Sequence, residues 1–148
     1  MITIERLTTY SSQDAADIGK LLPTLSARFS DNPVDEQLLC EIIDSPHHEQ
    51  IVAREDGRII GTATLSITIG TGAGRKAYLE DFVVDPNTQG TGIGSAIWDE
   101  IISWCTKREV SLFFTSNAQK QAAHRFYISH GAIIRDTTVF QWKKQNNS

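Results

Sequence analysis

Three glycines, Gly90, Gly92 and Gly94, lie between a strand-like apolar run and a helix-like run, and this arrangement suits the binding of an anion. Glycine lets the backbone approach a ligand closely, and the N–H groups that begin a helix have no partner within that helix. The helix dipole adds partial positive charge at the same place. The loop Gln89–Gly94 therefore predicts a phosphate or pyrophosphate site, although a tight turn can have the same composition.

Two common phosphate-binding motifs do not fit this loop. The dinucleotide fingerprint needs a third glycine where this chain has Ser95, and an acidic residue about 20 residues later, where it has Leu112. The Walker loop needs glycine and lysine where counting from Gly90 gives Ser95 and Ala96. These two nucleotide-binding interpretations are therefore excluded.

The run Val83–Gly94, which contains Asp85-Pro86 and the pattern Gln-x-x-Gly-x-Gly, resembles the acetyl-CoA loop of the GNAT superfamily of N-acetyltransferases. The family has Arg or Gln at the first position of this pattern, and Gln89 is the less common choice. The resemblance continues through Asn117, the pair Phe126-Tyr127 and Gly131, in the same order and spacing. It spans about the last half of the chain.

The resemblance implies acetyl-CoA as the cosubstrate. In the family the fourth and fifth strands separate so that the pantetheine arm runs between them, and the glycine loop holds the pyrophosphate. An asparagine contacts the pantetheine, and a tyrosine near the CoA sulfur acts as a general acid. Lys120 or Arg125 can reach the 3′-phosphate. The residues that the resemblance assigns to acetyl-CoA are Phe82, Val83, Val84, Gln89, Gly90, Thr91, Gly92, Ile93, Gly94, Ser95, Asn117 and Tyr127.

Some of these residue types have structural alternatives. Asn117 equally suits a helix N-cap, and the two roles are compatible. Tyr127 equally suits a core aromatic beside Phe126, but a phenol can also donate a proton to a departing thiolate.

Two adjacent carboxylates, Glu80 and Asp81, lie inside the apolar strand that precedes the loop. Burial of a carboxylate raises its pKa toward that of a useful base. Strict alternation places Glu80 with Tyr78, Phe82 and Val84, and Asp81 on the other face with Leu79 and Val83. Glu80 is the first candidate for the general base, acting directly or through water. Asp81 and ordered water alone are the alternatives, and a purely structural role for both carboxylates stays open.

The predicted activity is transfer of the acetyl group to a primary amine, most simply that of a small molecule, by direct attack in a ternary complex. Leu79-Glu80-Asp81 resembles the corresponding strand of the glucosamine-phosphate N-acetyltransferases. In the family the amine meets two loops, here residues 28–35 and 70–76, which carry charges of both signs. The alternatives are a lysine or N-terminal protein acetyltransferase and an acyl-CoA-binding module without catalysis.

The elements that must position these residues follow the order β-α-α-β-β-β-α-β-α-β(-β). This order predicts an α/β (α+β) fold with a mixed sheet of six to seven strands and helices on both faces, which is also the GNAT order. Ser11 or Ser12 caps the first helix, Pro23 ends it, and Asp56-Gly57 is the strongest hairpin signal. Leu38, Leu39, Ile42 and Ile43 are the expected inward face of the second helix. The expected strands cover 1–8, 50–54, 58–69, 78–84, 110–115 and one or two segments of 132–142. The third expected helix is long and covers 92–108, and the fourth lies between Asn117 and His130.

Length and composition fit one domain, residues 1–148. The net charge of −4 argues against nucleic acid as a partner, since phosphates need a basic excess. The two cysteines, Cys40 and Cys105, lie in apolar helical patterns and suit buried thiols, and no zinc pattern is present. No metal site, signal peptide or membrane span is therefore expected. A cytoplasmic protein follows, for which a homodimer is a compatible assembly.

Overall fold

A computed structural model describes residues 1–88 and 90–145, which form two compact units, Met1–Phe114 and Thr115–Ser148. The elements of the first unit are β1 (Ile2–Arg6), α1 (Ser12–Leu21), η1 (Leu22–Thr24), α2 (Glu36–Asp44), β2 (His48–Glu55), β3 (Arg58–Gly70), β4 (Gly74–Val84), η2 (Pro86–Thr88), α3 (Ile93–Lys107) and β5 (Leu112–Phe113). The second unit contains α4 (Gln121–Ser129).

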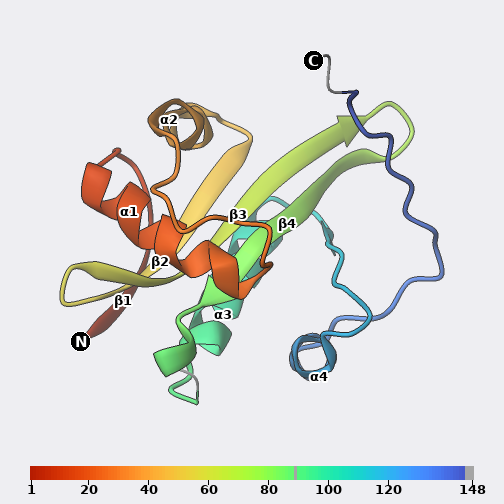
Figure 1. The fold of residues 1–148 in the computed structure, drawn as a ribbon. Coiled ribbons are helices and arrows are strands. Elements are labelled where there is room, and N and C mark those ends of the chain that lie inside the picture. Colours follow the sequence, from red (N-terminus) through yellow and green to blue (C-terminus); the bar gives the residue numbers. More distant parts are fainter. Residues whose placement is uncertain (89, 146–148) are drawn as a thin grey trace. The chain divides into compact units, whose positions relative to one another are not determined.

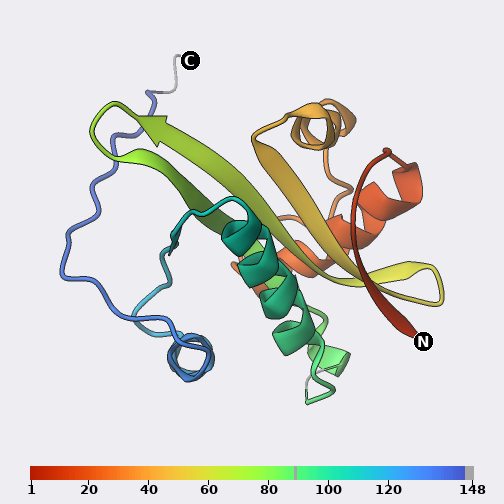
Figure 2. The ribbon, with the colours of Figure 1, turned by 180° about the vertical axis from the view of Figure 1, so that it is seen from behind.

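One five-stranded sheet in the order β1-β2-β3-β4-β5 organises the first unit (Figure 1). The first four strands are antiparallel and β5 is parallel to β4. Helices α1 and α2 cover one face of the sheet, and α3 lies on the other, as the view from behind shows (Figure 2). The expected mixed sheet with helices on both faces is confirmed, with five strands in place of six or seven.

Local signals at the ends of the first elements are also confirmed. The Ser11 hydroxyl caps α1 by accepting from the Asp14 N–H at 3.1 Å, and α1 gives way to the short helix η1 at Leu22-Pro23. Asp56 and Gly57 turn from β2 to β3 with φ angles of 51° and 79°. Positive φ at both central residues is the geometry that favours Asp-Gly in a tight hairpin.

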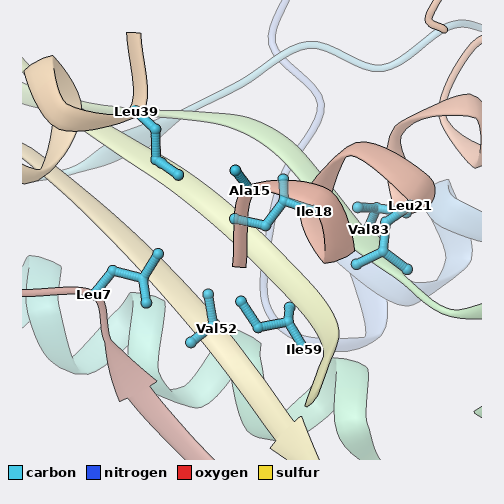
Figure 3. Close-up of a cluster of buried hydrophobic side chains, with 8 residues drawn as sticks. All are labelled: Leu7, Ala15, Ile18, Leu21, Leu39, Val52, Ile59 and Val83. Atoms are coloured by element: carbon cyan, nitrogen blue, oxygen red, sulfur yellow. The ribbon is translucent and has the colours of Figure 1, made fainter. Parts of the chain in front are cut away.

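The core on the α1–α2 face joins both helices to β2 and β4 (Figure 3). Leu39 is the buried residue of α2, with 1% of its surface exposed, whereas Leu38 is 53% exposed. The expectation that Leu38 faces inward is therefore wrong, because α2 buries only a narrow stripe. The cluster consists of Leu7, Ala15, Ile18, Leu21, Leu39, Val52, Ile59 and Val83.

Several expected boundaries change. The predicted strand 110–115 is reduced to Leu112–Phe113, and β4 begins at Gly74, so Arg75 and Lys76 belong to a strand and not to the preceding loop. Residues 132–142 all belong to the described part of the chain, and they form none of the expected strands. A strand needs a partner for its backbone groups, and the second unit contains none among its described residues.

Two carboxylates on α1 bind two arginines of the β2–β3 hairpin. Asp14 accepts from Arg54 Nη1 and Nη2 at 2.7 and 2.8 Å, and Arg54 also pairs with Glu5. Asp17 accepts from Arg58 at 2.7 and 3.0 Å and from the Ile59 N–H at 3.1 Å. Both aspartates are buried, at 7% and 5% exposure. These pairs anchor the start of α1 to the hairpin.

The pKa of each aspartate lies below its ordinary value. For Asp14 the main cause is hydrogen bonding to Arg54. For Asp17, burial opposes ionisation, but the bonds from Arg58, the Ile59 N–H and Gln13 together outweigh it. A carboxyl with a depressed folded-state pKa contributes stability that is complete above its ordinary pKa of 3.8. That contribution is lost as the pH falls from there through the folded-state value.

Asp14→Asn should therefore lower the free energy of unfolding by about 2 kcal/mol at neutral pH, because Arg54 loses a charged partner. It should also weaken the acid dependence below pH 4, roughly where carboxyls titrate. Urea unfolding from neutral pH down to about pH 2 measures both effects. Glu55→Gln, an exposed carboxylate on the same hairpin, is the matched control. Equal acid slopes for wild type and Asp14→Asn would contradict the role of this pair.

No helix among the described residues has the length and apolarity that crossing a membrane requires.

Candidate active site

Strand β4 carries one residue more than β3 between two paired positions. Thr62 pairs with Val83 but Thr64 pairs with Glu80, so the extra residue lies in the segment 81–82. Asp81 has a φ of 52°, in the left-handed region that residues with a side chain rarely adopt. Such a bulge bends a strand and re-aims side chains, and its backbone strain is typical of functional sites.

The bulge makes the expected alternation along β4 wrong. Leu79 pairs with Leu65, and Val83 pairs with Thr62. Thr62 and Leu65 point to opposite faces of β3, because β3 is regular against β2 over these residues. Leu79 and Val83 therefore lie on opposite faces, not on one. Glu80, paired with Thr64, lies on the α1–α2 face, and it does not share a face with Val84, which pairs with Gly61.

Both carboxylates at the bulge reach the surface. Protein around Asp81 nevertheless removes enough water to raise the pKa of its carboxyl, and the positive charge of Arg28 opposes this effect. The raised pKa expected of a carboxylate in this strand is thus found at Asp81. Arg28 follows η1, so the segment between α1 and α2 lies within electrostatic reach of the bulge.

Strands β4 and β5 pair over a short distance only. Ala77 pairs with Leu112 and Tyr78 with Phe113, and the Ala77 N–H donates to the Ser111 carbonyl at 2.9 Å. The β4–β5 ladder ends there, before residues 82–84. The expected separation of the two strands beside Phe82, Val83 and Val84 stays a prediction.

The glycine loop has the backbone that an anion cradle needs. Gly90 and Gly92 have φ angles of 82° and 83°, and a Cβ added at either would meet nothing within 4 Å. Gly92 is the N-cap of α3 and has no side chain with which to cap the helix. Thr91 donates its hydroxyl to the Thr88 carbonyl, which holds the loop. Ile93, 3% exposed, fixes the helix start in the core.

The start of α3 therefore offers amide groups and a dipole to an anion. Gly94 and Ser95 lie in the first turn of the helix. Gln89, the remaining loop residue of the expected site, lies outside the described residues.

Asn117 and Tyr127 belong to the second unit. Asn117 does not cap α4, whose N-cap is Lys120; its Oδ1 accepts from the Gln119 N–H at 2.9 Å instead. Tyr127 packs against Phe126 edge to face at 5.7 Å, and burial raises the pKa of its phenol. The helix ends before Gly131, which has a φ of 95°, in the left-handed region that glycine favours after a helix.

Neither cysteine has the surroundings of a nucleophile. Cys105 is 4% exposed, and burial raises the pKa of its thiol against a smaller opposite effect of Arg108. The pKa of the Cys40 thiol is raised by burial and by Glu36 and Asp44. Nucleophilic cysteines have lowered pKa values. Among the described residues, no three metal-binding side chains form a cluster.

Three polar residues near Glu80 were not foreseen. Gln50, Thr62 and Thr64 form a hydrogen-bonded group on the α1–α2 face, and Gln50 and Thr62 are 3% and 0% exposed. A glutamine directly before the apolar run of β2 was the available signal. The pairing of Thr64 with Glu80 on β4 could not be foreseen, because it depends on the bulge.

A mixed sheet with a bulged fourth strand, followed by a glycine loop that opens a helix, is the arrangement that the sequence resemblance predicts. The acetyltransferase (GNAT) family model matches residues 18–132, so the chain belongs to the GNAT family. Among curated proteins, an uncharacterised N-acetyltransferase of Mycobacterium tuberculosis is 28% identical over 80% of this chain and 74% of its own. Mouse thialysine N-epsilon-acetyltransferase is 31% identical over 57% of this chain and 47% of its own.

Solved structures share the same fold. An aminoglycoside acetyltransferase from an uncultured soil sample has a TM-score of 0.83 at 20% identity, covering 98% of this chain and 97% of its own. Aminoglycoside 6′-N-acetyltransferase from Acinetobacter baumannii has a TM-score of 0.76 at 20% identity, covering 99% and 100%. The protein is thus an N-acetyltransferase, and its family implies acetyl-CoA as cosubstrate.

Gly92→Val should weaken acetyl-CoA binding by about tenfold or more. A β-branched residue at a φ of 83° is strained by roughly 1–2 kcal/mol, and relief of the strain would move the loop. Titration calorimetry with acetyl-CoA measures the dissociation constant. Gly57→Val is the matched control, because Gly57 has a φ of 79° in an equally open turn on the β2–β3 hairpin. An equal loss of affinity in both variants would show a general effect on folding.

Proposed function

We propose that the protein transfers the acetyl group of acetyl-CoA to a primary amine of a small molecule. The observation that carries this proposal is Glu80, an exposed carboxylate next to a strained bulge and on the face opposite α3. Within residues 1–88 and 90–145 it takes part in no ion pair, so it is available to a cationic amine.

Two similar proteins support a small amine as the acceptor. One is named for thialysine and its epsilon nitrogen, and the other for aminoglycosides. The bulge also lies within electrostatic reach of the segment after η1, where the family receives its amine. Arg28 and Asp31 in this segment are exposed, so charges of both signs surround the entry.

In the proposed reaction, Glu80 takes a proton from the ammonium, directly or through water, and the freed lone pair attacks the thioester carbonyl. A C–N bond forms, the C–S bond breaks, and the thiolate takes the proton of the Tyr127 phenol. The amide nitrogen loses its second proton, which returns through water to the Tyr127 phenolate, and Glu80 releases its proton to solvent. Asp81, with its raised pKa, is the alternative base. The buried, high-pKa thiol of Cys105 supports direct attack over an acetyl-enzyme.

Acetyl-CoA binding is assigned to three groups of residues. The backbone of Phe82, Val83 and Val84 binds the pantetheine amides, and Asn117 contacts the same arm. The segment 89–95 binds the pyrophosphate through its amides and the dipole of α3. When bound, acetyl-CoA supplies the activated acetyl group, and all other chemistry falls to the side chains.

We further propose that residues 1–148 work as one acetyltransferase domain, since the family match spans parts of both units. The proposed location is the cytoplasm, and no nucleic acid, membrane or metal is proposed as a partner. A homodimer is a compatible assembly. Sedimentation in the presence and absence of acetyl-CoA tests the assembly.

Calorimetry with acetyl-CoA followed by a panel of amines tests the function, with free thiol release as the signal. The panel contains lysine-like amino acids, diamines, aminoglycosides, and peptides with free lysines or N-termini. Turnover of small amines is the expected result. Turnover restricted to peptides would establish the protein acetyltransferase instead, and binding without any turnover would establish an acyl-CoA-binding module.

A further inference from the structure

Gln50, Thr64 and Glu80 form one row across three strands on the α1–α2 face. Gln50 pairs with Thr64 on β3, and Thr64 pairs with Glu80 on β4. Side chains paired directly across antiparallel strands have Cβ atoms about 5 Å apart. The row begins at a buried amide and ends at an exposed carboxylate.

The hydrogen bonds at the buried end of this row have only one possible direction. The Ile51 carbonyl can only accept, so the Thr62 hydroxyl donates to it, at 2.8 Å. Thr62 Oγ1 then accepts from Gln50 Nε2 at 2.6 Å, which fixes the orientation of the Gln50 amide. Gln50 Oε1 must therefore accept from the Thr64 hydroxyl, at 2.8 Å. One backbone carbonyl thus sets the direction of the whole chain of bonds.

Because the single proton of the Thr64 hydroxyl is committed to Gln50, Thr64 Oγ1 can only accept further hydrogen bonds. The Glu80 carboxylate across the ladder also only accepts when ionised. Two acceptors on neighbouring strands are complementary to a group that has several donors and a positive charge. A primary ammonium, with three N–H donors, has this chemistry.

We propose that Thr64 is a binding and positioning residue for the acceptor amine, accepting one N–H while Glu80 takes the proton. This inference rests on the proposed function and deepens it. With one N–H held by Thr64, the nitrogen stays beside Glu80 while the carboxylate takes another proton and frees the lone pair. The buried chain Gln50–Thr62–Ile51 keeps the hydroxyl from turning its own proton toward the carboxylate. The protein therefore selects amines that bring at least two N–H donors.

Thr64→Val tests the inference, because valine keeps the shape of threonine and removes the hydroxyl. We expect kcat/KM for a primary amine to fall tenfold or more, as for loss of a hydrogen bond to a charged group. The dissociation constant of acetyl-CoA should not change. Thr64→Ser, which keeps the hydroxyl, should stay near wild type. If Thr64→Val does not fold, Thr64→Ala replaces it with the same expectation.

A second measurement separates binding from a structural role. The N,N-dimethyl analogue of the amine substrate has one N–H when protonated, so it can satisfy Glu80 but not Thr64 as well. Inhibition by this analogue and binding of the primary amine give a preference ratio. We expect Thr64→Val to reduce the wild-type preference about tenfold, whereas a residue that only stabilises the sheet would leave this ratio unchanged.

An unchanged kcat/KM, an unchanged preference ratio or a Thr64→Ser variant as impaired as Thr64→Val would overturn the inference while leaving the proposed function intact. If the wild-type protein acetylates no amine, the proposed function fails and this inference fails with it. The two failures are therefore distinguished by the wild-type assay alone.

Discussion

Glu80→Gln should lower kcat/KM for the amine by about 10²- to 10³-fold, the range of a lost general base. Glutamine keeps the size and polarity of the side chain but cannot take the ammonium proton. The deficit should shrink as the pH rises toward the pKa of the amine, because solution then supplies the neutral nucleophile. The pH profile of kcat/KM with saturating acetyl-CoA measures this effect.

One control for this prediction lies on β4, beside Glu80, and the other lies on β2. Asp81→Asn removes the alternative base, and Glu55→Gln removes an exposed carboxylate of the β2–β3 hairpin. We expect a smaller loss for Asp81→Asn and none for Glu55→Gln. If Asp81→Asn has the larger effect, with recovery at high pH, Asp81 is the base. The raised pKa of its carboxyl would then be the property that matters.

Tyr127→Phe should lower kcat by about 10²-fold with little change in the KM of either substrate. The variant removes one oxygen, and its loss would leave the thiolate without the proposed proton donor. Burial raises the pKa of this phenol above 10, so the acid form persists through neutral and moderately alkaline pH. Wild-type activity should fall only above that value, and the variant should lack this alkaline fall.

Tyr10→Phe is the matched control for Tyr127→Phe, because Tyr10 is a partly buried phenol whose ring packs against the core of the first unit. It should keep wild-type kcat and the alkaline fall. An unchanged kcat in Tyr127→Phe, or an alkaline fall that survives the substitution, would remove Tyr127 from the acid role. Its role would then be structural, and its packing against Phe126 would be part of that role.

The elements of the first unit could be predicted because each depends on local signals. Ser11, Pro23 and Asp56-Gly57 act through hydrogen bonds and φ angles within a few residues of themselves. The segment 132–142 shows the limit of this reasoning. Its apolar residues suit a strand, but a strand also requires a pairing partner, which no local pattern supplies.

The candidate site was predictable in its backbone and less so in its side chains. Glycines in a loop favour positive φ angles, and Gly90 and Gly92 adopt such angles. The faces of β4 could not be assigned, because one extra residue at Asp81 reverses the alternation of side chains. The alternating pattern of the sequence does not reveal such an extra residue. Thr64 was missed for the same reason: its partner across the ladder depends on the bulge.

The pairs that join Asp14 and Asp17 to the β2–β3 hairpin have a consequence for how such a protein can diverge. They hold the first turns of α1 against the hairpin. The position of α1 therefore does not depend on the exposed residues that follow η1, such as Arg28, Ser30 and Asp31. Substitutions at exposed positions of this kind usually change stability by less than about 0.5 kcal/mol. A lineage could therefore exchange one acceptor molecule for another by altering this segment, while the inherited scaffold and its acetyl donor stay the same.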